Sequence, residues 1–278
     1  MDMFLPFLKS SLTIAIPVYF AALGGLFPAL AGTLNIALEG LLLVSAFSAL
    51  AIFYFTGSAA AAVAGAILSA LMLAALHVFA VFKMRANLFI SGLAVNLFSS
   101  GLCIVLSDKI FNTKGVITAP FSQPLLKWYV LSALIFLLIT WLSIYKTPFG
   151  YRLRACEKCS DALVSLGKRP GVYKAGAILI SAFFCGISGS FLSLNLGSFV
   201  PGMSAGKGWI ALAVIFLGAK RPLGILAAAF IFALAEAFSN YAQGFLSIPI
   251  DFILAFPYIF TLIVMIFVSI IPKYRHNI

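Results

Sequence analysis

KTPFGYRLRACEKCSDALVSLGKRPGVYK, residues 146–174, is the longest clearly polar stretch in an otherwise apolar chain. It holds seven basic side chains against two acidic ones, and apolar runs flank it on both sides. Short basic loops between hydrophobic spans stay on the cytoplasmic side of a membrane. The spacing predicts one short amphipathic helix between Gly150 and Gly167. Its shared apolar face would carry Leu153, Cys156, Leu163 and Leu166.

The composition of the chain excludes a water-soluble domain. Of its 278 residues, 63% are hydrophobic and only 9% are charged, which is more apolar surface than one soluble core can bury. Repeated apolar stretches near 20 residues long are typical of a polytopic helical membrane protein. The net charge of +11 comes from basic residues at the ends of these stretches, where cytoplasmic retention and lipid phosphates explain it without nucleic acid.

The chain divides into nine apolar segments, and we treat residues 1–278 as a single transmembrane domain. The segments are residues 11–30, 34–55, 59–82, 87–106, 128–145, 172–194, 209–218, 222–241 and 248–271. The seventh is too short to cross about 30 Å of hydrocarbon, so we expect a broken or re-entrant element there and eight to ten spans in all. Alternation places the N-terminus and the loops 107–127 and 195–208 outside, and residues 146–174 inside.

Polar side chains inside the apolar segments are the candidates for a functional site. A carboxylate near the membrane centre costs about 2.5–3.5 kcal/mol, so Glu39 needs a cavity or a partner. Asn35 precedes it by four residues, and this spacing predicts one shared helical face. The pair forms either a polar patch near a transport path or, through Glu39, a cap on a broken helix. Asn96 in the fourth segment either joins two helices by hydrogen bonds or lines a substrate cavity.

Two further patterns concern the second half of the chain. Glu236 is a second intramembrane acid, and Asn240 and Gln243 follow it on one helical face, which favours a functional or helix-pairing role. The glycine-containing break AGTLNIALEG (residues 31–40) has a faint echo in SAGKGWIALA (residues 204–213). Short, glycine-interrupted segments in two halves of a chain often mark a transport site between inverted repeats.

No motif for catalysis is visible. GMSAGKG (residues 202–208) contains a Gly-Lys pair but lacks the first glycine and the Ser or Thr of a phosphate-binding loop. Cys156 and Cys159 form a CxxC pair without a second pair of ligands, so we expect neither a metal nor a redox site. We expect no enzyme activity and no cofactor in this chain.

Several stretches together resemble one family. They are TLNIALEGLLLVSAF (33–47), ISGLAVNLFSSGL (90–102), TPFGYRLRACEKCSDALVSLGKRP (147–170), PGMSAGKGWIALAVIFLGAKRPLG (201–224), FALAEAFSNYAQ (232–243) and AFPYIFTLIV (255–264). They are similar to the permease subunits of ABC importers for nucleosides, simple sugars and branched-chain amino acids, and most similar to the nucleoside-type branch. Two departures leave the substrate open: Cys156 and Cys159 stand where relatives have small or polar residues, and the chain holds 28 phenylalanines.

The resemblance implies a type II-like importer, an all-α bundle with two pseudo-repeated halves in a bacterial cytoplasmic membrane. Its partners would be a second, homologous permease, cytoplasmic ATPase subunits that hold ATP and magnesium, and an extracellular or periplasmic substrate-binding (lipo)protein. The cargo would be a purine or pyrimidine nucleoside. The alternatives are a simple sugar or a vitamin such as riboflavin in the same architecture, and a standalone transporter that uses Glu39 and Glu236 as ion sites.

The resemblance also assigns roles to residues. Residues 146–174 would be a coupling segment that ATP-driven closure of the ATPases shifts as a lever. The expected ATPase contacts are Arg152, Arg154, Glu157, Asp161 and Leu163. The expected substrate path contains Asn35, Glu39, Asn96, Glu236 and Asn240.

Overall fold

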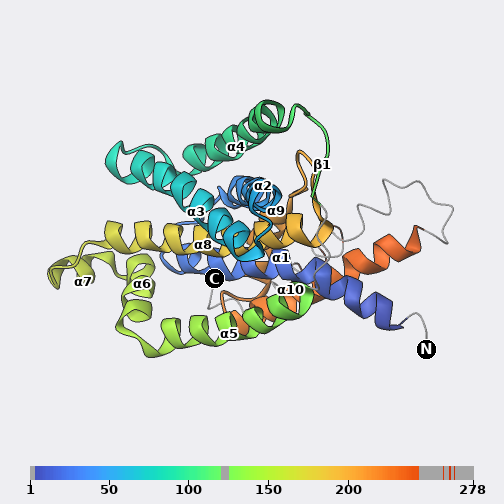
Figure 1. Cartoon of the computed structure of the whole chain (residues 1–278). Coiled ribbons are helices and arrows are strands. Elements are labelled where there is room, and N and C mark those ends of the chain that lie inside the picture. The colour runs from blue at the N-terminus through green and yellow to red at the C-terminus, as the bar shows by residue number, and fades with distance from the viewer. Residues whose placement is uncertain (1–3, 120–124, 244–258, 260–262, 264–265, 267–278) are drawn as a thin grey trace.

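The computed structural model describes residues 4–119, 125–243, 259, 263 and 266, and it is almost entirely helical (Figure 1). In chain order the elements are α1 (Phe4–Leu30), α2 (Leu38–Thr56), α3 (Ala59–Val78), the π-helical turn η1 (Phe79–Lys83), α4 (Leu88–Phe111), β1 (Ile117–Thr118), α5 (Leu125–Lys146), α6 (Pro148–Lys158), α7 (Ser160–Ser165), α8 (Pro170–Leu196), β2 (Ser198–Phe199), α9 (Lys207–Leu217) and α10 (Pro222–Ala242). The predicted all-α bundle is confirmed.

α1 and α8 form the centre of the bundle, and 83% of the residues in their apolar windows are buried. α8 packs against α1, α2 and α3, while α1 also packs against α9 and α10. α3 and α4 lie together on one side of this centre, and α5 lies on another side (Figure 1). Within the described residues, seven helices are long and apolar enough to cross a membrane.

Small residues allow the central helices to approach closely. A Cβ atom on Gly189 of α8 would lie 2.5 Å from the Leu42 carbonyl oxygen of α2. The Ser45 hydroxyl of α2 donates to the Cys185 carbonyl oxygen at 3.0 Å, and the Ser188 hydroxyl donates to the Pro17 carbonyl oxygen at 2.6 Å. Close backbone contact and hydroxyl hydrogen bonds replace the hydrophobic effect as the main attraction between helices in lipid.

The two ends of the bundle differ in structure, and both carry basic residues. α6, α7 and the turn between α3 and α4 lie at one end, and β1 lies at the other (Figure 1). The first end carries basic residues of the 146–174 stretch together with Lys83 and Arg85, as expected of a cytoplasmic face. At the other end β1 pairs with β2, so that Ile117 lies opposite Phe199. The two loops predicted to lie outside therefore meet each other.

The predicted segments agree with the helices with few exceptions. The short seventh segment is α9, which has 11 residues. The predicted ninth segment, residues 248–271, lies almost wholly outside the described residues, so the number of spans stays a prediction.

Candidate functional site

α2 begins at the buried Leu38 and α9 at the half-buried Lys207, and the two starting points lie together. α2 follows an irregular stretch, residues 31–37. α9 has 11 residues, about 16 Å at 1.5 Å per residue and thus half a bilayer. A Cβ atom on Gly208 would lie 2.6 Å from the Cα atom of Glu39. The structure therefore places the two similar segments, residues 31–40 and 204–213, against each other.

The Glu39 carboxylate closes the N-terminus of α9. Its Oε1 accepts a hydrogen bond from the Gly206 N–H at 2.9 Å, and its Oε2 accepts one from the Gly208 N–H at 2.7 Å. The first N–H groups of a helix have no partner within it, and the positive end of the helix dipole favours a carboxylate. This geometry favours the interpretation of Glu39 as the cap of a broken helix, whereas its contact with cargo stays a prediction.

Asn35 does not share a helical face with Glu39, so that prediction is wrong. Asn35 lies in the irregular stretch before α2 begins and is 1% exposed. Its Oδ1 accepts from the Ala37 N–H at 3.1 Å, and its Nδ2 donates to the Ser181 hydroxyl of α8 at 2.6 Å. A short amide side chain competes in this way with helical hydrogen bonding. Asn35 thereby ties the stretch that leads into α2 to the central helix α8.

Asn96 reaches from α4 to the first turn of α2. Its Oδ1 accepts from the Gly40 N–H at 2.8 Å, and its Nδ2 donates to the Ile36 carbonyl oxygen at 2.9 Å. One side chain thus satisfies a backbone donor and a backbone acceptor where the helix starts, which favours the helix-joining interpretation. Its role as a lining residue of the substrate path stays a prediction.

α10 brings the second acidic residue to the same region. Glu236 is half-buried and interacts electrostatically with Lys207, the first residue of α9. Lys207 stands between the two glycines that donate to Glu39. Asn240, one turn further along α10, is exposed. Of the predicted path residues, Glu39 and Asn96 therefore hold the starts of α9 and α2, and Glu236 lies within electrostatic range of Lys207.

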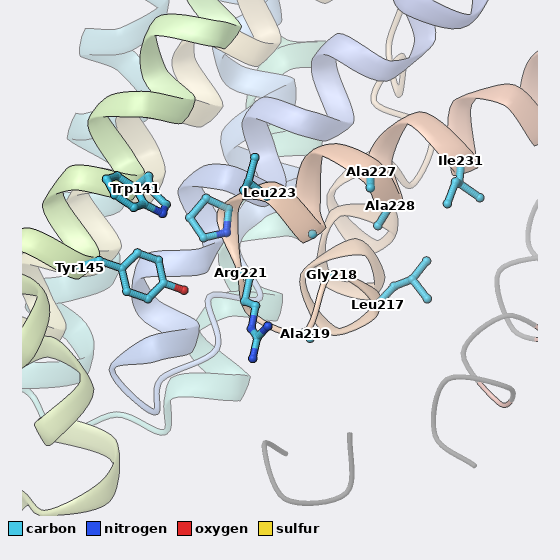
Figure 2. Close-up of a pocket in the computed structure, with 12 residues that line it drawn as sticks. Trp141, Tyr145, Leu217, Gly218, Ala219, Arg221, Leu223, Ala227, Ala228 and Ile231 are labelled. Carbon is cyan, nitrogen blue, oxygen red and sulfur yellow. The ribbon is translucent and has the colours of Figure 1, made fainter. Parts of the chain in front are cut away.

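A cavity of about 700 Å³ lies at the basic end of the bundle, between α5, the α9–α10 turn and α10. Trp141 and Tyr145 of α5 line one side and face Arg221 and Leu223 (Figure 2). A largely apolar pocket with a few polar groups is the usual form of a small-molecule site. Sequence reasoning missed this cavity because Trp, Tyr and Arg at helix ends are also ordinary membrane-interface residues.

The stretch 146–174 forms two helices, so the prediction of one continuous helix from Gly150 to Gly167 is wrong. The chain breaks at Cys159, whose φ and ψ are −146° and 58°. The break separates α6 from α7 and redirects the second helix. Leu153, Cys156 and Leu163 are buried as expected, but Leu166 is 73% exposed.

Three of the five predicted ATPase contacts are engaged within the chain. The Arg154 guanidinium donates to the Gly150 and Ile144 carbonyl oxygens at 3.4 and 3.3 Å. The Glu157 carboxylate accepts a hydrogen bond from Lys220 at 2.9 Å. Leu163 is only 3% exposed. These residues hold α6 and α7 against the bundle, and an additional contact with an ATPase stays a prediction.

The remaining two predicted contacts, Arg152 and Asp161, are exposed, as Glu157 is. Arg152 makes one side-chain hydrogen bond, at 3.3 Å to the Tyr173 hydroxyl, and Asp161 lies on the open surface of α7. Beside Asp161 the side chains of Val164 and Leu166 are 59% and 73% exposed. We call Asp161, Val164 and Leu166 the α7 surface. Exposed apolar side chains with charged neighbours are typical of a protein interface.

The profile of the family described as "Branched-chain amino acid transport system / permease component" matches residues 7–269. The chain belongs to this permease family. The permease is 29% identical to the guanosine ABC transporter permease protein NupQ of Bacillus subtilis, over 92% of this chain and 89% of that protein. It is 27% identical to the nucleoside ABC transporter permease protein NupC of Lactococcus lactis, over 90% and 87%. The predicted resemblance to the nucleoside-type branch is confirmed.

A solved structure has the same fold as the permease. PsaBC from Streptococcus pneumoniae, in complex with Fab, superposes with a TM-score of 0.58 over 97% of this chain and 94% of that chain, at 16% sequence identity. At this identity the likeness concerns the fold alone. The membrane-length helices and the permease relatives make this chain a multi-pass membrane protein. Its helices are arranged as in that structure.

The two cysteines of α6 test which face the permease presents to the cytosol. Cys159 is exposed, whereas Cys156 is buried, and burial raises the pKa of the Cys156 thiol. Less thiolate means slower reaction with maleimide. We expect a membrane-impermeant maleimide to label Cys159 in inside-out vesicles and not in intact cells. Peptide mass spectrometry should show Cys156 labelled at least about tenfold more slowly.

Two outcomes would contradict this prediction. Labelling of Cys159 from outside the cell would place α6 and α7 on the wrong side of the membrane. Equal labelling rates for the two thiols would mean that Cys156 does not face the bundle. A Cys159→Ser variant is the control, because it should lose the fast labelling and keep the rest.

Proposed function

We propose that the permease is the membrane subunit of an ATP-driven importer that carries a purine or pyrimidine nucleoside into a bacterial cell. The observation that carries this proposal is the alignment, over nine-tenths of the chain, with two proteins named for guanosine and nucleoside transport. The permease would not be an enzyme. ATP and magnesium would bind to separate ATPase subunits on the cytoplasmic side.

The α7 surface is the proposed contact with the ATPase. It lies at the basic end of the bundle, where positively charged loops remain in the cytosol. Leu166 and Val164 offer an apolar anchor, and Asp161 offers a charge at its rim. Apolar side chains that become buried in an interface contribute most of its binding energy. Such a contact could transmit movement from one subunit to the other.

The cavity beside α5 is the proposed cytoplasmic part of the cargo path. The rings of Trp141 and Tyr145 suit stacking on a flat nucleobase, and Arg221 supplies hydrogen-bond donors for its carbonyl groups. Both carboxylate oxygens of Glu39 already accept backbone hydrogen bonds. This leaves Glu39 poorly suited as a sodium or proton site and supports an ATP-driven importer over a standalone ion-coupled transporter.

Two further partners complete the proposed assembly. A second, homologous permease would lie beside this one in the bacterial cytoplasmic membrane, with the cargo path between or within them. An extracellular binding protein would deliver cargo to the end where β1 and β2 join two loops. That pairing supports a stable docking surface, since it holds both loops in one position.

Reconstitution tests the cargo directly. The permease, its ATPase subunits, the second permease and the binding protein would be placed in liposomes with radiolabelled guanosine or uridine. We expect uptake only with ATP, and competition by unlabelled nucleosides rather than by glucose or riboflavin. ATP-independent uptake by the permease alone would overturn the proposal, and competition only by glucose or by riboflavin would replace the cargo.

A single substitution tests the ATPase contact. Leu166→Asp puts a carboxylate into an interface that should exclude water, at a cost of about 2–4 kcal/mol. We expect at least a tenfold loss of ATPase co-purification, by about 1.4 kcal/mol per factor of ten, with normal insertion in the membrane. The control is Val116→Asp at the opposite end, where Val116 is also exposed. Full co-purification of the Leu166→Asp variant would exclude the α7 surface as the contact.

A further inference from the structure

One ion pair joins the coupling segment to the turn between α9 and α10. The Lys220 ammonium lies 2.9 Å from Oε1 of Glu157, and the two side chains are 20% and 34% exposed. Partial burial reduces the screening that makes most surface pairs weak. The pair connects residues 63 positions apart in the chain. It is therefore a tertiary link between α6 and the end of α9.

The turn that carries Lys220 is stiff. Ala219 and Lys220 have φ angles of 51° and 53°. Residues other than glycine keep this left-handed conformation only where the surrounding structure fixes it. Backbone hydrogen bonds from Ala219 to Phe216 and from Lys220 to Ile215, at 2.9 and 3.0 Å, provide that restraint. A force on the Lys220 side chain would thus move the turn as a unit.

Glu157 also lies close to Gly32, in the turn that leads into α2. Gly32 has a φ of 72°, and a Cβ atom there would lie 3.3 Å from the Cα atom of Glu157. Glu157 is therefore placed between the turn before α2 and the turn after α9. These are the two helices whose starting points meet at Glu39.

The Lys220 turn is also a wall of the cavity. Gly218, Ala219 and Arg221, on both sides of Lys220, line it opposite Trp141 and Tyr145 (Figure 2). At its other end α9 is held by the two hydrogen bonds to Glu39. A displacement of α6 would reach this wall through the ion pair while the start of α9 stays in place.

We propose that the Glu157–Lys220 ion pair transmits movement of the coupling segment to the wall of the cavity, so that the nucleotide state of the ATPase sets how open the cavity is. This rests on the proposed function. Glu157 and Lys220 are positioning residues, which act through Ala219 and Arg221 rather than by touching cargo. The pair links two elements whose relative position differs between transport states.

The experiment measures opening of the cavity without using cargo. Ala227 lines the cavity and is exposed, so an Ala227→Cys substitution in a Cys159→Ser background reports access by maleimide. The permease would be assembled with its ATPase subunits and second permease in nanodiscs. Maleimide labelling would then be measured in the presence of ATP, magnesium and vanadate, and again without nucleotide. We expect the two labelling rates to differ at least about fivefold.

Variants of the pair decide the outcome. Lys220→Glu should reduce the ratio of the two rates to about one while ATP hydrolysis continues, and Lys220→Arg should keep the ratio. The swap Glu157→Lys with Lys220→Glu should restore at least half of the difference. Lys109→Glu, an exposed lysine at the opposite end, is the control. Lys220→Met and Glu157→Gln replace the charge reversals if these fail to assemble.

Three results would overturn the inference. They are an undiminished ratio in Lys220→Glu or Lys220→Met, a swap that assembles but restores nothing, and an equal loss in Lys109→Glu. The readout also separates this inference from the proposed cargo. If no nucleoside is transported, the nucleoside proposal fails, whereas the labelling ratio still decides whether the pair connects the coupling segment to the cavity.

Discussion

Glu39→Ala is expected to lower the apparent melting temperature of the purified permease by roughly 6–12 °C, because about 3 kcal/mol of folding free energy is lost. The substitution removes two charge-assisted hydrogen bonds, to the Gly206 and Gly208 N–H groups. Each such bond contributes about 1.5–3 kcal/mol. The freed donors are the first N–H groups of α9, which have no other partner within the helix. Thermal unfolding in detergent, followed by intrinsic fluorescence, measures the change.

Two variants give this prediction its controls. Glu39→Gln keeps one acceptor oxygen and loses the charge, so we expect about half the effect. Asp108→Asn removes another carboxylate, whose nearest cation, Lys114, lies 4.0 Å away at an exposed site, so we expect no measurable change. A melting temperature for Glu39→Ala within about 2 °C of the unmodified permease would show that Glu39 does not hold α9.

Gly189→Ala is expected to destabilise the permease by about 1–3 kcal/mol. The added methyl group would meet the Ser45 side chain, the Leu42 carbonyl oxygen at 2.5 Å and the Ala46 nitrogen at 2.8 Å, all on α2. Two of these are backbone atoms, which cannot rotate away as a side chain end would. α2 and α8 would therefore separate, and α2 carries both Glu39 and the first turn held by Asn96. The apparent melting temperature measures this effect as well.

Gly176→Ala is the matched control for the steric argument, because Gly176 lies in the same helix. No atom lies within 4 Å of a Cβ built there. Alanine is the better helix former, so we expect a gain of about 0.5–1 kcal/mol. A loss of stability in Gly176→Ala as large as that in Gly189→Ala would mean that α8 tolerates no methyl group anywhere. The close approach of α2 would then not explain the effect.

The positions of the spanning segments were predictable because bilayer thickness dictates their length and composition. Each described span overlaps its apolar run, although α1 begins at Phe4 rather than near Ser11, and even the short segment 209–218 corresponds to α9. The inside position of residues 146–174 followed from their basic side chains, and alternation along the chain then placed the loops 107–127 and 195–208 outside. The pairing of Ile117 with Phe199 agrees with two loops at one end. These properties depend on local composition, which a single sequence contains.

The contacts that define the site were less predictable because they join distant parts of the chain. Glu39 and Gly206 are 167 positions apart, and the sequence around either residue does not indicate that the two are in contact. The helical-face argument for Asn35 failed because its side chain bonds the backbone of Ala37 and so favours an irregular conformation. Leu166 is exposed although Leu163 is buried as predicted, because α7 ends at Ser165 and Leu166 lies beyond the helix.

α3, α4 and α5 form the least buried part of the bundle, with 28%, 22% and 17% of their apolar windows covered by the rest of the chain. Where their outward side chains face hydrocarbon, that solvent distinguishes poorly between leucine, isoleucine, valine and phenylalanine. Evolution can therefore exchange these side chains freely. In α1 and α8 a single exchange demands a second one in the neighbouring helix, so divergence between species would be slow at the centre and fast at the rim.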